Sequence, residues 1–157
     1  MNFVTPYNGD PQEGHLSTPV SASGFTKLFI GNLPAYRKGL TPSRRGLEIG
    51  MAHGYFLYGP FALCGPARGT DAAGITALLA SAGLIMVLTI ALSLQGEVKT
   101  GKPADPHAPD VFTTSSGWSD FAGSFFIGAS GGAFVAYLLY SNLAGLNAIF
   151  TGLINYS

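Results

Sequence analysis

The chain of 157 residues has room for one domain, and charged residues make up only 10% of it, against about 25% for an ordinary soluble domain. Its eight basic and eight acidic side chains balance, and the basic ones form no dense run, which argues against a nucleic-acid partner. Composition therefore favours a protein of the lipid bilayer.

Residues 1–40 form an N-terminal arm that is polar and interrupted by prolines and glycines at irregular spacing. This spacing argues against one long helix, while side chains such as Phe25 and Leu28 make the arm too apolar for a disordered tail. We expect an ordered arm that lies on one membrane face, with a short interfacial helix near 24–33.

Residues 41–157 are expected to form an all-α membrane domain with three transmembrane helices and a short C-terminal segment. The clearest span is 72–94, which has 23 residues without a charge. At 1.5 Å per residue it covers about 34 Å, enough to cross the hydrocarbon core of a bilayer. A second clear span, at about 118–143, follows a polar, proline-rich loop.

The span at 118–143 carries the start signals of a helix. Ser115 or Ser116 is expected to cap it, and Asp120 in the first turn suits the positive end of the helix dipole. Trp118 stands where an interfacial aromatic anchor is expected.

The remaining span, at about 43–63, is less apolar because it contains two arginines, Glu48 and His53. Glycines at Gly50 and Gly54 would thin the helix surface where a flat ring could lie. The single cysteine, Cys64, follows this span, and we expect its thiol to be buried and structural.

The basic residues predict the orientation of the chain. With three spans, the arm and the 95–117 loop share one side and hold seven of the eight basic residues, whereas Arg68 alone lies on the other. This bias predicts a cytoplasmic (or stromal) N-terminus, and it favours three spans over two. The seven are Lys27, Arg37, Lys38, Arg44, Arg45, Lys99 and Lys102.

Two ionisable side chains of the span at 43–63 lie at membrane depth. A helix that enters near residue 43 places Glu48 about 7 Å deep and His53 about 15 Å deep. A charge at the bilayer centre costs on the order of 2.5–3.5 kcal/mol, so such residues are functional candidates. Glu48 also has the spacing for an ion pair with Arg44 or Arg45, and His53 could hydrogen-bond a neighbouring helix.

A single embedded imidazole suits a planar tetrapyrrole, whose metal needs only one axial ligand from the protein. A zinc or iron site without such a ring wants several converging ligands, and the other histidines, His15 and His107, lie outside the spans. Glu48 and His53 are about 140° apart around a helix, so they would hold two separate rings. A haem with two histidine ligands would need its second histidine from a partner protein. A haem- or quinone-binding anchor of a respiratory oxidoreductase is therefore the alternative function. A purely structural scaffold is a third possibility.

A stripe of small residues recurs every four positions in the last span. It allows close approach of helices in lipid, and the sequence leaves open whether it faces this chain's own helices, another subunit or a pigment. The stripe consists of Ser124, Gly128, Gly132 and Ala136.

Several long strings resemble one known family, subunit XI of photosystem I. In the arm these are PYNGDP (6–11), GHLSTP (14–19) and FIGNLPAYRKGL (29–40). In the spans they are RGLEIGMAHGYFLYGPF (45–61) and SGWSDFAGSFFIGASGGAFVAYLL (116–139).

The resemblance implies three transmembrane helices in the photosynthetic (thylakoid) membrane, or in the plasma membrane of a host without thylakoids. It implies chlorophyll a bound through Glu48 and His53, with β-carotene and bound lipid alongside. It also implies contact with the large core subunits, with small membrane subunits and, across a trimer-type interface, with copies of the chain itself. No nucleophile–base arrangement, P-loop or CxxC motif is present, so we expect no enzyme.

One departure from the family pattern counts against a calcium site. Relatives can carry an acidic residue directly after the string GPxR, whereas GPAR (65–68) is followed here by Gly69 and Thr70. Pro66 and Asp71 are the remaining candidate ligands. Because of this departure, the sequence does not decide whether the complex is a trimer, a monomer or a tetramer.

Overall fold

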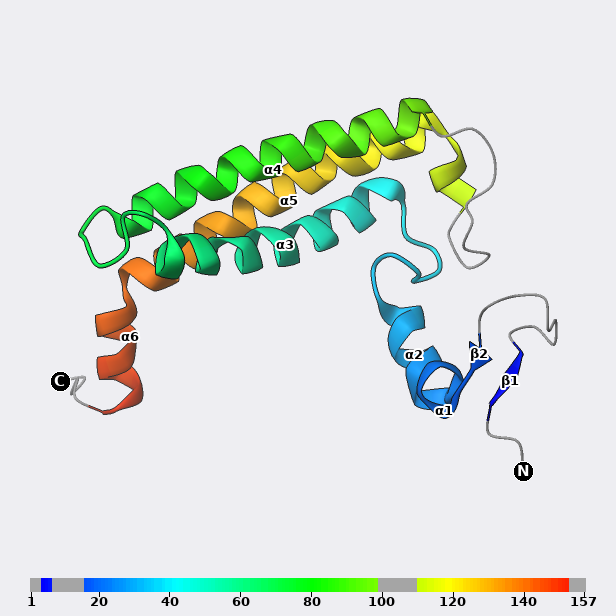
Figure 1. The fold of residues 1–157 in the computed structure, drawn as a ribbon, viewed down its shortest axis with the longest axis horizontal. Coiled ribbons are helices and arrows are strands. Elements are labelled where there is room, and N and C mark those ends of the chain that lie inside the picture. Colours follow the sequence, from blue (N-terminus) through cyan, green and yellow to red (C-terminus); the bar gives the residue numbers. More distant parts are fainter. Residues whose placement is uncertain (1–3, 7–15, 99–109, 153–157) are drawn as a thin grey trace. The chain divides into compact units, whose positions relative to one another are not determined.

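The computed structural model describes residues 4–6, 16–98 and 110–152 (Figure 1). The chain divides into two compact units, Met1–Gly39 and Leu40–Ser157, which are taken in turn.

The first unit holds two short strands and two short helices. Strands β1 (Thr5–Pro6) and β2 (Leu16–Ser17) pair antiparallel, and helices α1 (Pro19–Ala22) and α2 (Gly24–Asn32) follow. Each helix starts at a hydroxyl cap, α1 at Thr18 and α2 at Ser23. The short helix predicted at 24–33 is therefore present, and its position at a membrane surface stays a prediction.

The second unit is built from three long helices. They are α3 (Pro42–Cys64), α4 (Ala73–Val98) and α5 (Ser115–Ser141). A 3₁₀ turn, η2 (Asp110–Thr113), precedes α5, and the short helix α6 (Leu143–Phe150) follows it.

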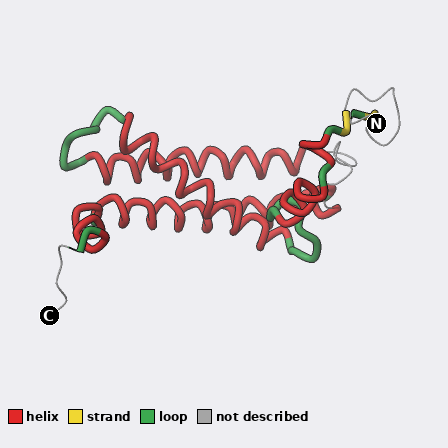
Figure 2. Tube along the Cα trace, turned by 90° about the horizontal axis from the view of Figure 1, so that it is seen from below, coloured by secondary structure: helices red, strands yellow, loops and turns green. Residues whose placement is uncertain are grey.

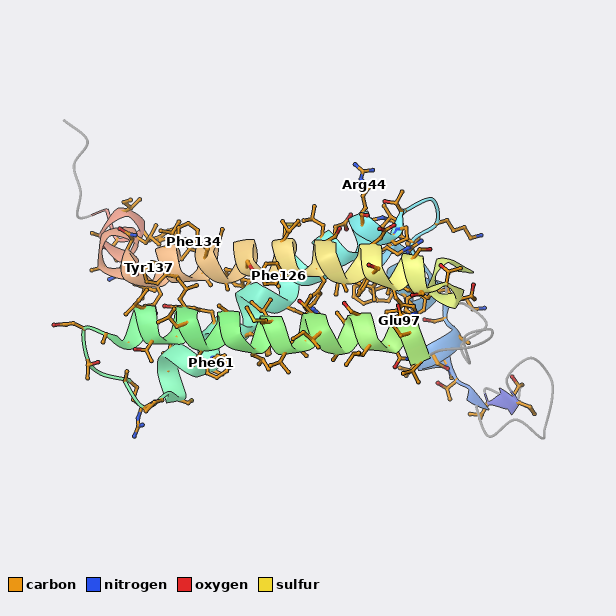
Figure 3. All side chains as sticks on the ribbon, turned by 90° about the horizontal axis from the view of Figure 1, so that it is seen from above. Arg44, Phe61, Glu97, Phe126, Phe134 and Tyr137 are labelled. Carbon is orange, nitrogen blue, oxygen red and sulfur yellow. The ribbon has the colours of Figure 1, made fainter. Side chains whose placement is uncertain are left out.

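The long helices lie side by side along one axis, with α4 antiparallel to the other two (Figures 1 and 2). The Ser115 hydroxyl at the start of α5 donates to Oε1 of Glu97 near the end of α4. At the opposite end, the hydroxyl of Tyr58 in α3 donates to the carbonyl of Gly74 in α4, at 3.3 Å. Figure 3 shows Arg44 and Glu97 toward one end of the bundle and Tyr137 toward the other.

Within the described residues, two helices are long and apolar enough to cross a membrane, α4 and α5. The 23 residues of α3 span about 35 Å, but its charged residues lower its hydropathy. All three helices match the predicted spans at 43–63, 72–94 and 118–143 closely. The largest difference is at the end of α4, which runs on to Val98.

Three details of the prediction were wrong. Thr114, and not Ser115 or Ser116, caps α5, because its hydroxyl accepts from the Gly117 N–H at 3.1 Å. Asp120 is consequently the sixth residue of α5 and lies outside the first turn. Cys64 is exposed, because it ends α3 on a face that no other described part of the bundle covers.

The core of the bundle is made largely of small side chains. Ala77, Ala129 and Ala133 are each at most 1% exposed, and larger side chains such as Ile85 and Phe125 pack among them. Small residues allow helices to approach closely where the hydrophobic effect does not drive them together.

Candidate ligand site on helix α3

Glycines of α3 bring its backbone directly against α5. Gly46, Gly50 and Gly54 recur every four residues and are buried. A Cβ at Gly50 would lie 2.9 Å from the Ala129 N, and one at Gly54 would lie 2.7 Å from the Ala129 Cα. No side chain fits at these positions, so the glycines set the distance between the two helices.

The contact is reciprocal, because two glycines of α5 face the backbone of α3. A Cβ at Gly128 would lie 3.0 Å from the Met51 N, and one at Gly132 would lie 2.9 Å from the Tyr55 N. These two members of the predicted stripe therefore pack within the chain.

The ends of the stripe lie differently. Ala136 is buried at 7% exposure in a second core cluster with Tyr58, Ala62 and Ala77. Ser124 is half-buried.

The placement of Gly50 and Gly54 corrects one expectation. A flat ring cannot lie on these glycines, because α5 covers them. The four-residue spacing of Gly46, Gly50 and Gly54 was the signal for this contact, and the sequence reading missed it by weighing only the stripe on the last span.

His53 is exposed on α3, one residue before the buried Gly54. Its Nδ1 lies 2.8 Å from the carbonyl oxygen of Ile49, one turn earlier. Because a carbonyl only accepts, the proton is on Nδ1, and Nε2 of the neutral ring keeps its lone pair. The ring also meets the ring of Phe125 in α5 edge-on, with centroids 5.9 Å apart and an angle of 61°.

Glu48 is half-buried near the start of α3, and Arg45 beside it is only 3% exposed. Glu48 and His53 stand five positions apart on α3, which corresponds to about 140° around the helix. Among the residues described, no three His, Cys, Asp or Glu side chains are grouped to hold a metal ion. The chemistry open to α3 is therefore one ligand for each metal centre.

The calcium candidates Pro66 and Asp71 are both exposed at the other end of the bundle. Asp71 lines a hollow of about 400 Å³ together with Tyr137 and Tyr140. Among the described residues, Asp71 belongs to no group of three or more His, Cys, Asp or Glu side chains that could hold a metal ion.

An apolar groove of about 550 Å³ lies between α3 and α5. Met51 and Tyr55 line it from α3, and Ile127, Gly131 and Val135 line it from α5. Gly131 has nothing within 4 Å of its Cβ position, so the groove is open there.

Comparison with known proteins agrees with this arrangement. The family model of photosystem I reaction centre subunit XI matches residues 3–145. The chain belongs to this family. The chain is 55% identical to subunit XI of Synechocystis sp. over 152 residues, which cover 97% of the chain and 96% of that protein. Subunit XI of Thermosynechococcus vestitus is 53% identical over 98% of the chain and 97% of its own length, and that of Porphyra purpurea is 53% identical over 90% of each.

Membership of the subunit XI family decides between the classes that the sequence left open. The chain is a structural reaction-centre subunit and not an enzyme. The respiratory membrane anchor that binds haem or quinone finds no support among these relatives.

Proposed function

We propose that this chain is a three-span subunit of photosystem I in the photosynthetic membrane, and that α3 holds chlorophyll a through His53 and Glu48. The observation that carries the proposal is the state of the His53 ring. The side chain is exposed, and its Nδ1–H is bonded to the Ile49 carbonyl, which leaves Nε2 as the nitrogen that could bind a metal. Histidines that bind metals commonly donate their other N–H to a carbonyl in this way.

The residues of α3 fit a magnesium tetrapyrrole. When bound, a chlorophyll would supply light absorption. His53 would hold one such ring through its imidazole nitrogen, and Glu48, on a different face of the helix, would hold a second through a carboxylate oxygen. The helix holds these groups at fixed positions, and no bond is made or broken.

The apolar groove between α3 and α5 suits β-carotene. A carotene is long and carries no polar group, and every residue that lines the groove is apolar except for the tyrosine hydroxyl of Tyr55. Membrane lipid is the competing occupant of the same surface.

The proposal includes a membrane orientation. Seven of the eight basic residues belong to the arm, the start of α3 and the 95–117 loop, which favours a cytoplasmic or stromal N-terminus and three crossings. In a host without thylakoids the same orientation would apply to the plasma membrane.

The partners are the other subunits of photosystem I, both the large core subunits and the small membrane ones, with copies of this chain across an oligomer interface. Large apolar side chains on α4 support such contacts, since Leu79, Val87 and Leu94 are 58–67% exposed in the isolated chain. In a membrane complex, lipid, pigment or a neighbouring subunit covers such a face.

Replacing the histidine tests the proposal. In the purified complex, His53→Ala should lose about one chlorophyll for each copy of the chain, because the axial nitrogen is gone. Pigment extraction and absorption spectra measure this loss. The control is His107→Ala, which should leave the pigment content unchanged. Full pigment content in the His53→Ala complex would contradict the proposal, and a haem band in the wild-type extract would point to the respiratory class.

A further inference from the structure

The ring of His53 is touched by a side chain from another helix. Its Nδ1–H is bonded within α3, and the ring of Phe125 in α5 meets it edge-on at 5.9 Å. The hydrogen bond restrains one edge of the imidazole, and the aromatic contact restrains the direction of the ring plane. Edge-to-face contacts of this kind have a preferred geometry.

Phe125 is itself held firmly in place. Its side chain is 4% exposed and packs with Ile85 and Ala129 in the core. Its ring stacks on that of Phe121, with centroids 6.4 Å apart. Its backbone lies directly against α3, because a Cβ at Gly50 would lie 3.1 Å from the Phe125 carbonyl carbon.

We propose that Phe125 is a positioning residue that fixes the direction of the His53 imidazole toward its chlorophyll. The inference rests on the proposed function, and it adds a residue of α5 to a site otherwise carried by α3. The side-chain torsion that turns an imidazole ring about its Cβ–Cγ bond has broad minima. The hydrogen bond at Nδ1 alone therefore leaves some freedom in the direction of the His53 ring plane. With the Phe125 ring present, Nε2 points in one direction.

Absorption spectra can therefore distinguish the role of His53 from that of Phe125. His53 binds the pigment, so its loss removes an absorption band. Phe125 only orients the ligand, so its loss should shift or broaden that same band while the pigment stays bound. If Phe125 only filled space in the core, its replacement would lower the stability of the subunit without specifically changing this absorption band.

The experiment compares Phe125→Leu and Phe125→Met in the purified complex, in the wild-type and in the His53→Ala backgrounds. Phe126→Leu is the matched control, because this neighbouring ring is 39% exposed and projects about 100° away from Phe125 around the helix. The readouts are the chlorophyll content and low-temperature absorption and circular dichroism difference spectra. Phe125→Met keeps a side chain of similar bulk and so protects the helix contact.

We expect both Phe125 variants to shift the band that His53→Ala removes, with no loss of chlorophyll, and to cause no such shift in the His53→Ala background. A shift that persists without His53, or no shift at all, would overturn the positioning role. Loss of the subunit in both variants would assign the ring to helix packing alone and overturn it too. An unchanged spectrum in His53→Ala would instead refute the proposed function, independently of Phe125.

Discussion

At the residue scale, the ring of His53 is oriented by its own helix. The Ile49 carbonyl, 2.8 Å from Nδ1, can only accept, so Nδ1 carries a proton and Nε2 is the nitrogen left for a ligand role. A partner of this kind is usually worth 10- to 100-fold in metal affinity in other proteins. Here the hydrogen-bond acceptor is a backbone carbonyl of the same helix, so no additional polar side chain is needed in the span.

Glu48 has two competing roles, as a ligand and as the partner of an arginine, and two substitutions separate them. A glutamine keeps an oxygen for magnesium but removes the charge, whereas an alanine removes both. If Glu48 is a ligand, Glu48→Gln should keep its chlorophyll and Glu48→Ala should lose about one for each copy. Pigment extraction of the purified complex measures this.

The same series tests whether the two sites are separate. Because Glu48 and His53 project about 140° apart on the helix, the pigment losses in Glu48→Ala and His53→Ala should add in the double variant. A combined loss no greater than either single loss would mean that both residues serve one ring. If Glu48→Gln and Glu48→Ala have the same chlorophyll content, the result would favour the ion pair with an arginine over the ligand role of Glu48.

At the scale of elements, α3 and α5 are joined through their backbones. Glycines of each helix face the main chain of the other, so the contact has no side chain that can adjust. α4 joins the pair through small residues such as Ala77 and Ser81, whose hydroxyl donates to the Ala77 carbonyl within its own helix at 2.8 Å. The proposed pigment ligands His53 and Glu48 therefore stand on a helix whose backbone is fixed against that of α5.

A pair of adjacent glycines in α5 tests this contact. Gly132→Ala would place a Cβ 2.9 Å from the Tyr55 N, in backbone that cannot give way, and should cost on the order of 1–3 kcal/mol of stability. Gly131→Ala meets nothing within 4 Å, and alanine favours a helix over glycine, so it should be neutral or stabilising. The measurement is the temperature at which the subunit is released from the purified complex. Equal release temperatures for the two variants would show that the helices do not touch at Gly132.

The sequence predicted the helices better than their pairing. Apolar runs and flanking turns located all three long helices to within a few residues, although the run in α3 is interrupted by Arg44, Arg45, Glu48 and His53. The cap at Thr114 was missed, because four hydroxyl residues stand in a row at 113–116 and each could cap. For the candidate site, the sequence suggests His53 and Glu48 as ligands, which stays a prediction. The contact with Phe125 depends on the register between helices, which no local pattern encodes.

At the scale of the whole molecule, the second unit buries too little to stand alone in water. Large apolar side chains of α4 and α5 remain exposed, including Leu79 at 67% and Ile127 at 66%. Contiguous apolar surface of this kind marks a membrane or protein interface. This surface fits a membrane subunit that associates with the other subunits of photosystem I.

The number of crossings decides how this surface meets the membrane, and labelling of single cysteines can count them. With Cys64 replaced by serine, Lys38→Cys, Arg68→Cys and Val98→Cys are made one at a time and treated with an impermeant maleimide in vesicles whose cytoplasmic face is outward. Three spans place Lys38 and Val98 on the outer side of such vesicles and Arg68 inside, so only Arg68→Cys should need detergent before it reacts. If α3 instead lies on the surface, Lys38 and Arg68 share one side and should react alike, opposite to Val98. That pattern would reject α3 as a span, and with it a site at membrane depth for His53.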